Sequence, residues 1–217
     1  HRENLTLIAE KVETNEQLAE ARGLGFDLFQ GYFFCRPEVL NSTRICESKL
    51  AHYRLLQTAQ SEEFNLVKVE QVIKSDVALT AKLLKYINAA AFPWADTIRS
   101  VRHSLTLMGE SNIRRWISMI ALTGMVADKP WELAVASTSR GRFCELVGRL
   151  VDRLHTELEH FLLGAFSTLE AMLDVPMELA LRQIPISGDL RGALCGEHNI
   201  LRDLLDLSDA YEQGKWS

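Results

Sequence analysis

The sequence lacks several features that would point to particular classes of protein. Its four cysteines, Cys35, Cys46, Cys144 and Cys195, lie far apart and form no C-x-x-C pair, so neither a structural zinc site nor a dithiol redox site is predicted. No apolar run approaches the roughly 20 residues that a membrane-spanning helix needs. No charged segment followed by an apolar leader opens the chain. We therefore expect reduced thiols and a cytoplasmic location without membrane contact.

The sequence also has no excess of basic residues. The formal net charge is −5 and the isoelectric point is near 5.7, whereas proteins that bind nucleic acid carry clustered Lys and Arg. Nucleic acid is therefore not an expected partner. The composition is that of an ordinary globular protein, with 47% hydrophobic and 24% charged residues in a chain of 217, which suits one or two domains.

The start of the chain differs in pattern from the rest. A short apolar run at 5–8 and an aromatic run at 26–34 are typical of strands, while Thr14 and Gln17 have the spacing of a helix capping box between them. The pattern predicts strand, helix, strand. Such a unit belongs to a parallel sheet covered on both faces. Either the rest of the sheet precedes this chain or the unit packs onto the later part of the chain, and we favour the first.

From residue 48 onwards the pattern is that of helices. Apolar residues recur at helical spacing, and Ser100 and Ser111 are placed to cap two helices. The first of these is expected to end at Gly109, and the longest helix is expected at about 131–154. The chain is therefore predicted to be mainly all-α.

Two motifs in the first segment resemble a known family. Residues 9–14 read A-E-K-V-E-T, and residues 25–32 read G-F-D-L-F-Q-G-Y. They resemble the last two strands of the EAL domain, a (β/α) barrel that hydrolyses cyclic di-GMP. The resemblance implies that Glu10, Glu13 and Gln30 match positions in or beside a two-metal site at the mouth of the barrel. The E-A-L motif, the paired aspartates and the catalytic lysine are absent from the sequence, so we expect remnants and no intact catalytic site.

A second resemblance begins near residue 50 and extends to the C-terminus. Residues 69–90 read V-E-Q-V-I-K-S-D-V-A-L-T-A-K-L-L-K-Y-I-N-A-A, followed by I-R-S-V at 98–101 and L-M-G at 107–109. They resemble the HDOD domain, an HD-related helical output domain of bacterial signalling proteins. The two resemblances together imply an EAL-like remnant at 1–40 and an HDOD-like helical domain at 41–217, with a linker at its start.

The HDOD resemblance also implies a scaffold that has lost its metal ligands. HD phosphohydrolases hold a divalent ion with histidines and aspartates, and the ion lowers the pKa of a bound water. After F-L-L-G-A-F at 161–166, the place of the adjacent His-Asp pair holds Ser167 and Thr168. No histidine lies between Pro130 and Leu154 to act as the first ligand. No metal or other cofactor is therefore expected.

Other titratable residues near this position are expected to be structural. The spacing of His155 and His160 indicates a partly exposed pair on a polar turn. Glu145 and Asp152 are seven residues apart on one face of the expected helix, and no His or Cys lies between them. They are therefore expected to be solvent-facing charges.

The sequence supports three functional hypotheses. The first, which we favour from the sequence, is a noncatalytic signalling module that is not an enzyme. It would bind another signalling protein, or report the state of the upstream EAL barrel, in cyclic di-GMP or two-component signalling. The second is the regulatory C-terminal part of a cyclic di-GMP phosphodiesterase whose catalytic barrel is mostly missing from this chain. The third is a sensor of a small ligand in a vestigial pocket near residues 137–142.

Overall fold

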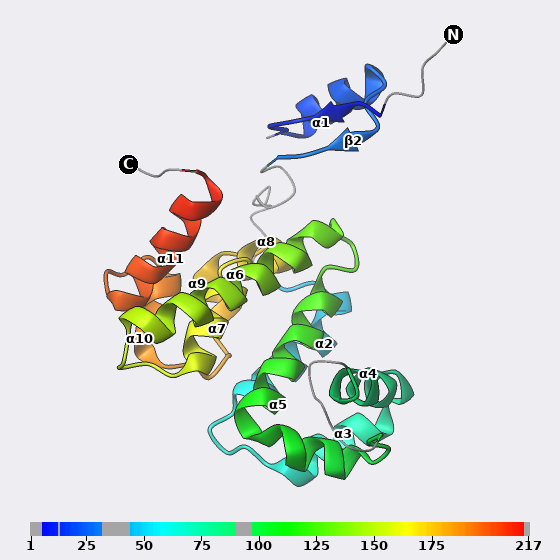
Figure 1. The fold of residues 1–217 in the computed structure, drawn as a ribbon, viewed down its shortest axis with the longest axis vertical. Helices are drawn as coiled ribbons and strands as arrows, with labels where there is room; N and C mark the ends of the chain where they lie inside the picture. Colours follow the sequence, from blue (N-terminus) through cyan, green and yellow to red (C-terminus); the bar gives the residue numbers. More distant parts are fainter. Residues whose placement is uncertain (1–5, 13, 32–43, 90–96, 215–217) are drawn as a thin grey trace.

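The computed structural model describes residues 6–12, 14–31, 44–89 and 97–214, and this part of the chain is mainly helical (Figure 1). A strand–helix–strand unit comes first: β1 (Ile8–Ala9), α1 (Asn15–Gly23) and β2 (Leu28–Phe29). The helical body follows: α2 (Glu47–Gln60), α3 (Leu66–Ser75), α4 (Val77–Ile87), α5 (Val101–Met125), α6 (Trp131–Val151), α7 (Glu157–Phe166), α8 (Leu169–Leu173), α9 (Met177–Leu181), α10 (Gly188–Leu194) and α11 (Ile200–Glu212).

The first unit has the order that the sequence predicts. Its two strands pair in parallel, with Ile8 beside Leu28. Thr14 caps α1 by accepting a hydrogen bond from the Gln17 backbone N at 3.2 Å. Figure 1 shows the unit apart from the helical body. Its buried residues form a small cluster of their own: Ala9, Val12, Leu18 and Ala21.

Polar side chains explain where several helices of the body begin. Asp76 accepts hydrogen bonds from Ala78 N and Leu79 N in the first turn of α4, and Ser100 accepts one from His103 N at the start of α5. α7 begins with a capping box in which Thr156 and Glu159 each bind the other's backbone N. Such caps satisfy backbone donors that have no partner inside the helix.

α5 contains a break at Gly109, where the sequence predicts a helix end. Gly109 has φ of 71° and ψ of 164°, a conformation that glycine adopts far more readily than other residues. The helix resumes directly after the glycine and does not wait for a new cap at Ser111. α5 is therefore two helices joined at a kink.

Two clusters of buried hydrophobic residues form the core of the body. The smaller one lies among α3, α4 and most of α5, and the larger one gathers α6 to α11 with the end of α5. α2 belongs to both, since Leu56 lies in the larger cluster and Ala59 in the smaller. A buried hydrogen bond of 2.8 Å from Gln60 Nε2 to Ser118 Oγ also joins α2 to α5. The two clusters therefore share their central helix pair.

This fold does not test two expectations from the sequence, the domain boundary and the cytoplasmic location. The predicted domain boundary at residues 40 and 41 lies outside the described residues. Within the described residues, none of the helices combines the length and apolar character needed to cross a membrane. The cytoplasmic location stays a prediction.

Candidate functional site

The first candidate site lies where the two parallel strands end. Glu10 follows β1 and Gln30 follows β2, and both side chains are exposed. Gln30 N donates to Ala9 O at 2.7 Å, and Val12 N donates to Gln30 O at 3.0 Å. The parallel pairing therefore continues past the strands and brings Glu10 and Gln30 to the same edge. Glu13, the third residue expected here, lies outside the described residues.

This edge depends on the close approach of the chain at Gly31. A Cβ at this position would overlap the backbone of Val12, so a larger residue would push the two strand ends apart. A carboxylate and an amide oxygen can contribute to a divalent-metal site. They are too few to hold a metal pair, and among residues 6–12, 14–31, 44–89 and 97–214 no cluster of His, Cys, Asp and Glu is arranged to bind one. The described residues alone do not fit a two-metal centre.

The second candidate site is the position that the HDOD resemblance assigns to the lost His-Asp pair. Ser167 directly follows α7, and its Oγ donates to Gly164 O at 2.7 Å. Thr168 is buried, and its Oγ1 donates to Ala165 O at 3.3 Å. Both hydroxyls therefore bind carbonyl groups at the end of α7.

Arg140 of α6 extends to the same position. Its Nη1 donates to Ser167 Oγ at 3.3 Å. Its other nitrogens bind Glu212 at 2.8 and 2.6 Å and Asp209 at 3.2 Å, both on α11. A guanidinium thus supplies positive charge beside Ser167, and it would repel a divalent cation placed there. Ser167, Thr168 and Arg140 do not fit a metal site.

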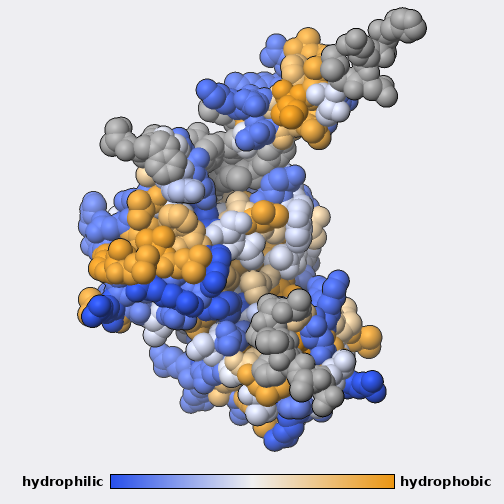
Figure 2. All heavy atoms as spheres, viewed as in Figure 1, coloured by the Kyte–Doolittle hydropathy of each residue, from blue (hydrophilic) through white to orange (hydrophobic). Residues whose placement is uncertain are grey.

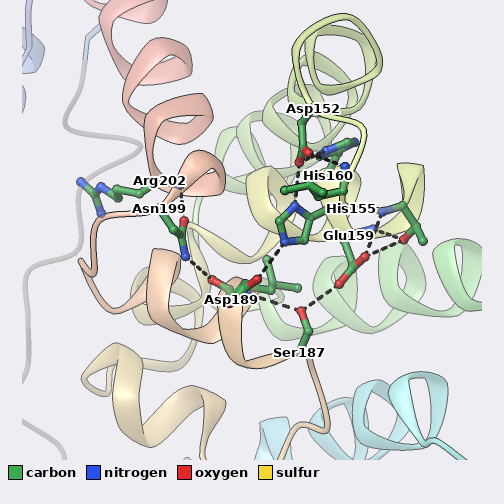
Figure 3. A network of polar contacts seen from close by, with 11 residues as sticks. Asp152, His155, Glu159, His160, Ser187, Asp189, Asn199 and Arg202 are labelled. Atoms are coloured by element: carbon green, nitrogen blue, oxygen red, sulfur yellow. Dashed lines mark hydrogen bonds and ion pairs between the residues drawn. The ribbon is translucent and has the colours of Figure 1, made fainter.

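The third site is a buried polar network at the turn between α6 and α7 (Figure 3). Asp152 is only 4% exposed. Its Oδ2 accepts hydrogen bonds from His155 Nδ1 at 2.7 Å and His160 Nε2 at 2.8 Å, and its Oδ1 accepts one from Leu154 N at 2.8 Å. His155 Nε2 also contacts Asp189 of α10 at 3.2 Å. The network therefore joins the turn, α7 and α10.

The surroundings of Asp152 and His155 shift both of their pKa values. Burial raises the pKa of Asp152, but the hydrogen bonds from His160, Leu154 and His155 outweigh burial and lower this pKa to about 2. Burial lowers the pKa of His155, yet its contacts with Asp152 and Asp189 outweigh burial and raise this pKa above 6.5. Asp152 is therefore ionised at neutral pH and holds both imidazole rings by charge-assisted hydrogen bonds.

Three side chains in this region correct the expectations from the sequence. Glu145 and Asp152 are buried and do not face solvent, and His160 is buried where a partly exposed ring is expected. Some of the groups that bind them lie outside α6, namely Arg115 of α5 and His160 of α7, which the spacing along α6 does not reveal. Glu145 accepts hydrogen bonds of 2.9 Å from arginines of two helices: Arg115, Arg142 and Arg149.

The cysteines that the structure describes are free thiols: Cys46, Cys144 and Cys195. Burial raises the pKa of Cys144 to about 12, which leaves almost no reactive thiolate at neutral pH. Cys46 is exposed, and hydrogen bonds with Ser48 lower its pKa.

Comparison with known proteins assigns this helical body to a family. The model of the HDOD domain matches residues 50–166, which is more than half of the chain. The chain belongs to the HDOD family. The match runs from α2 to the end of α7, so it includes Asp152, His155 and His160 and ends directly before Ser167.

Two curated relatives extend the similarity beyond the HDOD domain. A Vibrio cholerae protein named cyclic di-GMP phosphodiesterase CdgJ is 33% identical over 210 residues, which are 96% of this chain and 48% of that protein. An uncharacterized Bacillus subtilis protein, YuxH, is 28% identical over 215 residues, which are 98% of this chain and 52% of that protein. The chain thus spans about half the length of these relatives. No solved structure matches it significantly.

The similarity to CdgJ corrects one expectation. From the missing HD ligands, the sequence predicts that the chain is not an enzyme. That prediction is contradicted by a relative that is named as a phosphodiesterase and is similar over nearly the whole chain. Ser167 and Thr168, which the HDOD resemblance places at the His-Asp pair, directly follow the matched residues. Their side chains do not decide the activity of the protein to which the domain belongs.

Proposed function

We propose that this chain is part of a cyclic di-GMP phosphodiesterase, in which its first segment completes an EAL-type barrel and its HDOD domain regulates the rate. The observation that carries the proposal is the parallel pairing of β1 and β2, which brings Glu10 and Gln30 to one edge. The similarity to CdgJ supports it, because the 96% of the chain that is covered must include much of the strand–helix–strand unit.

The chemistry of this edge suits a phosphodiesterase. Enzymes that cleave phosphodiesters commonly place metal ions at the attacking and leaving oxygens, and such ions are held by oxygen ligands. In an intact barrel, Glu10 would supply one such ligand at the C-terminal end of a parallel strand, where barrel enzymes build their active sites. Gln30 would lie beside it, with an amide able to orient substrate or another ligand. The remaining ligands would come from other strands.

The regulatory role of the HDOD domain rests on its position in the chain. β2 precedes the HDOD domain in the same polypeptide. A change in the packing of the domain can therefore be transmitted to the ends of β1 and β2. The ion pairs of Arg140 with α11 stabilise a fixed arrangement of helices at the former HD position. We infer that the domain controls how the barrel is held.

The test is the rate of cyclic di-GMP hydrolysis by the full-length protein that carries this chain, assayed with Mg²⁺ or Mn²⁺. Glu10→Gln keeps the size of the side chain and removes its charge, so kcat should fall by about 100-fold through the weakened metal site. Glu20→Gln, an exposed change on α1, is the matched control and should leave kcat unchanged. Wild-type kcat in Glu10→Gln would overturn the proposal.

A further inference from the structure

α6, the turn after it and α11 expose an apolar surface that we call the α6–α11 patch. Figure 2 shows apolar residues gathered over α11 and the adjoining edge of α6, with a hydrophilic band along the far side of α6. Leu150 and Leu154 are 83% and 84% exposed, which is unusual for large apolar side chains. The exposed members of the patch are Leu146, Leu150, Val151, Leu154, Ile200, Leu207 and Tyr211.

Direct contact between the two helices makes these residues one surface. The rings of Phe143 on α6 and Tyr211 on α11 lie 5.2 Å apart. Leu146 and Leu150 follow Phe143 along α6 at helical spacing, and Leu207 precedes Tyr211 by one turn of α11. The two helices run antiparallel, since Arg140 binds Glu212 and Cys144 lies beside Ser208, so these residues extend the contact in one direction along both helices. Contiguous apolar patches of more than a few hundred Å² are rare on monomers and usually mark interfaces.

The patch lies between a basic edge and an acidic edge. Arg149 is on the side of α6 that faces α7, where it binds Glu157 at 2.8 Å, and the exposed Arg153 follows the end of α6. Asp203 and Asp206 are exposed on α11, where Asp206 binds Arg202 at 2.8 Å. Arg153 and Asp203 form no ion pair with any residue that the structure describes. Arg153 on the basic edge and Asp203 on the acidic edge are thus available to form ion pairs with a docked partner.

We propose that the α6–α11 patch is the surface on which a second copy of this chain docks. A two-fold axis along the two helices places α6 of one copy on α11 of the other, so that the same patch is used twice. This arrangement sets the basic edge of each copy against the acidic edge of its partner and brings Arg153 opposite the partner's Asp203. The patch has a basic edge on one side and an acidic edge on the other. It therefore complements a second copy of itself better than it complements a partner whose charges are all of one sign.

The first test is the mass of the 217-residue chain in solution, measured by light scattering on a sizing column over about a hundredfold range of concentration. We expect a dimer. Leu150→Glu places a charge in the centre of the patch and should raise the dissociation constant by about 100-fold or more. Val77→Glu is the matched control, because Val77 is 84% exposed on α4, and it should leave the dimer intact.

A charge exchange tests the orientation of the two copies. Arg153→Glu and Asp203→Arg should each weaken the dimer, since each places like charges opposite one another across the axis. The double variant should recover wild-type mass. Both residues are exposed, so these variants keep the proposal testable even if Leu150→Glu does not fold. A monomer at every concentration, or a dimer that none of these changes weakens, would overturn the proposal.

Discussion

Removing the Asp152 carboxylate would leave two imidazole N–H groups without this acceptor, a part-buried one on His155 and a buried one on His160. His160 Nδ1 already has no hydrogen-bond partner in the described structure, so this ring depends on Asp152. We expect Asp152→Ala to lower the free energy of unfolding by about 3 kcal/mol, measured by urea denaturation. Asp189→Ala removes only the exposed partner of His155 and should cost less than about 1 kcal/mol. Equal, small losses in both variants would contradict this account.

The same network makes stability depend on pH. The pKa of Asp152 is lowered from 3.8 to about 2, so its contribution is present above pH 3.8 and is lost as the pH falls through about 2. The pKa of His155 is raised above 6.5, so its contribution is complete below pH 6.5 and is lost as the pH rises through the raised pKa. Unfolding titrations across the acid range should show a loss of about 2 kcal/mol from Asp152. An unchanged acid dependence in Asp152→Ala would argue against it.

Residue burial is the feature that the sequence predicts least well. Ser167 and Thr168 can be found from the motif before them, because that signal is contained in one segment. The burial of Glu145 cannot, since Arg115 of α5 lies thirty positions away in the chain and covers it only in the folded state. Asp152 and His160 pair across a turn, so neither helix pattern alone indicates that they are buried.

α6 and α7 approach each other so closely that glycines are required between them. A Cβ at Gly164 would overlap the Arg140 carbonyl, and one at Gly148 would overlap the His160 ring. We expect Gly164→Ala to destabilise the protein by about 3 kcal/mol, because the obstacle is backbone that must shift. In Gly188→Ala the added methyl meets nothing within 4 Å, so that control should keep its melting temperature. A wild-type melting temperature in Gly164→Ala would show that the two helices can separate at little cost.

Structural features that depend on the residues of one helix or strand are predicted well from the sequence. Features that depend on contacts with other elements are not. The caps at Thr14 and Ser100 and the break at Gly109 follow from local backbone chemistry. The helix expected at 131–154 ends at Val151 because Asp152 leaves helical geometry, with φ −124° and ψ 123°, and binds partners beyond the helix. The end of α6 therefore depends on the contacts of Asp152 with His155 and His160, which lie outside the helix.

At the scale of the whole molecule, the strand–helix–strand unit stands out among the described residues because its own core is small. The strand–helix–strand unit exposes large apolar side chains, and a two-stranded sheet is marginally stable in water. Its exposed apolar residues are Leu7, Ile8, Leu24 and Leu28. In the isolated chain, amide hydrogens of residues 8–30 should exchange about 100-fold faster than those of α7, measured by mass spectrometry. Similar protection in both regions would contradict this prediction, whereas slower exchange of this unit in the full-length protein would fit a completed barrel.

The shared helix pair limits how the helical body can be divided. α2 and α5 each supply residues to both clusters of the core, so a cut in the chain between residues 60 and 101 would leave each fragment without half of the packing it needs. In the design of fusion proteins and split reporters, the helical body should therefore be kept as one undivided unit. Insertions belong outside it, or in surface turns that leave this pair intact.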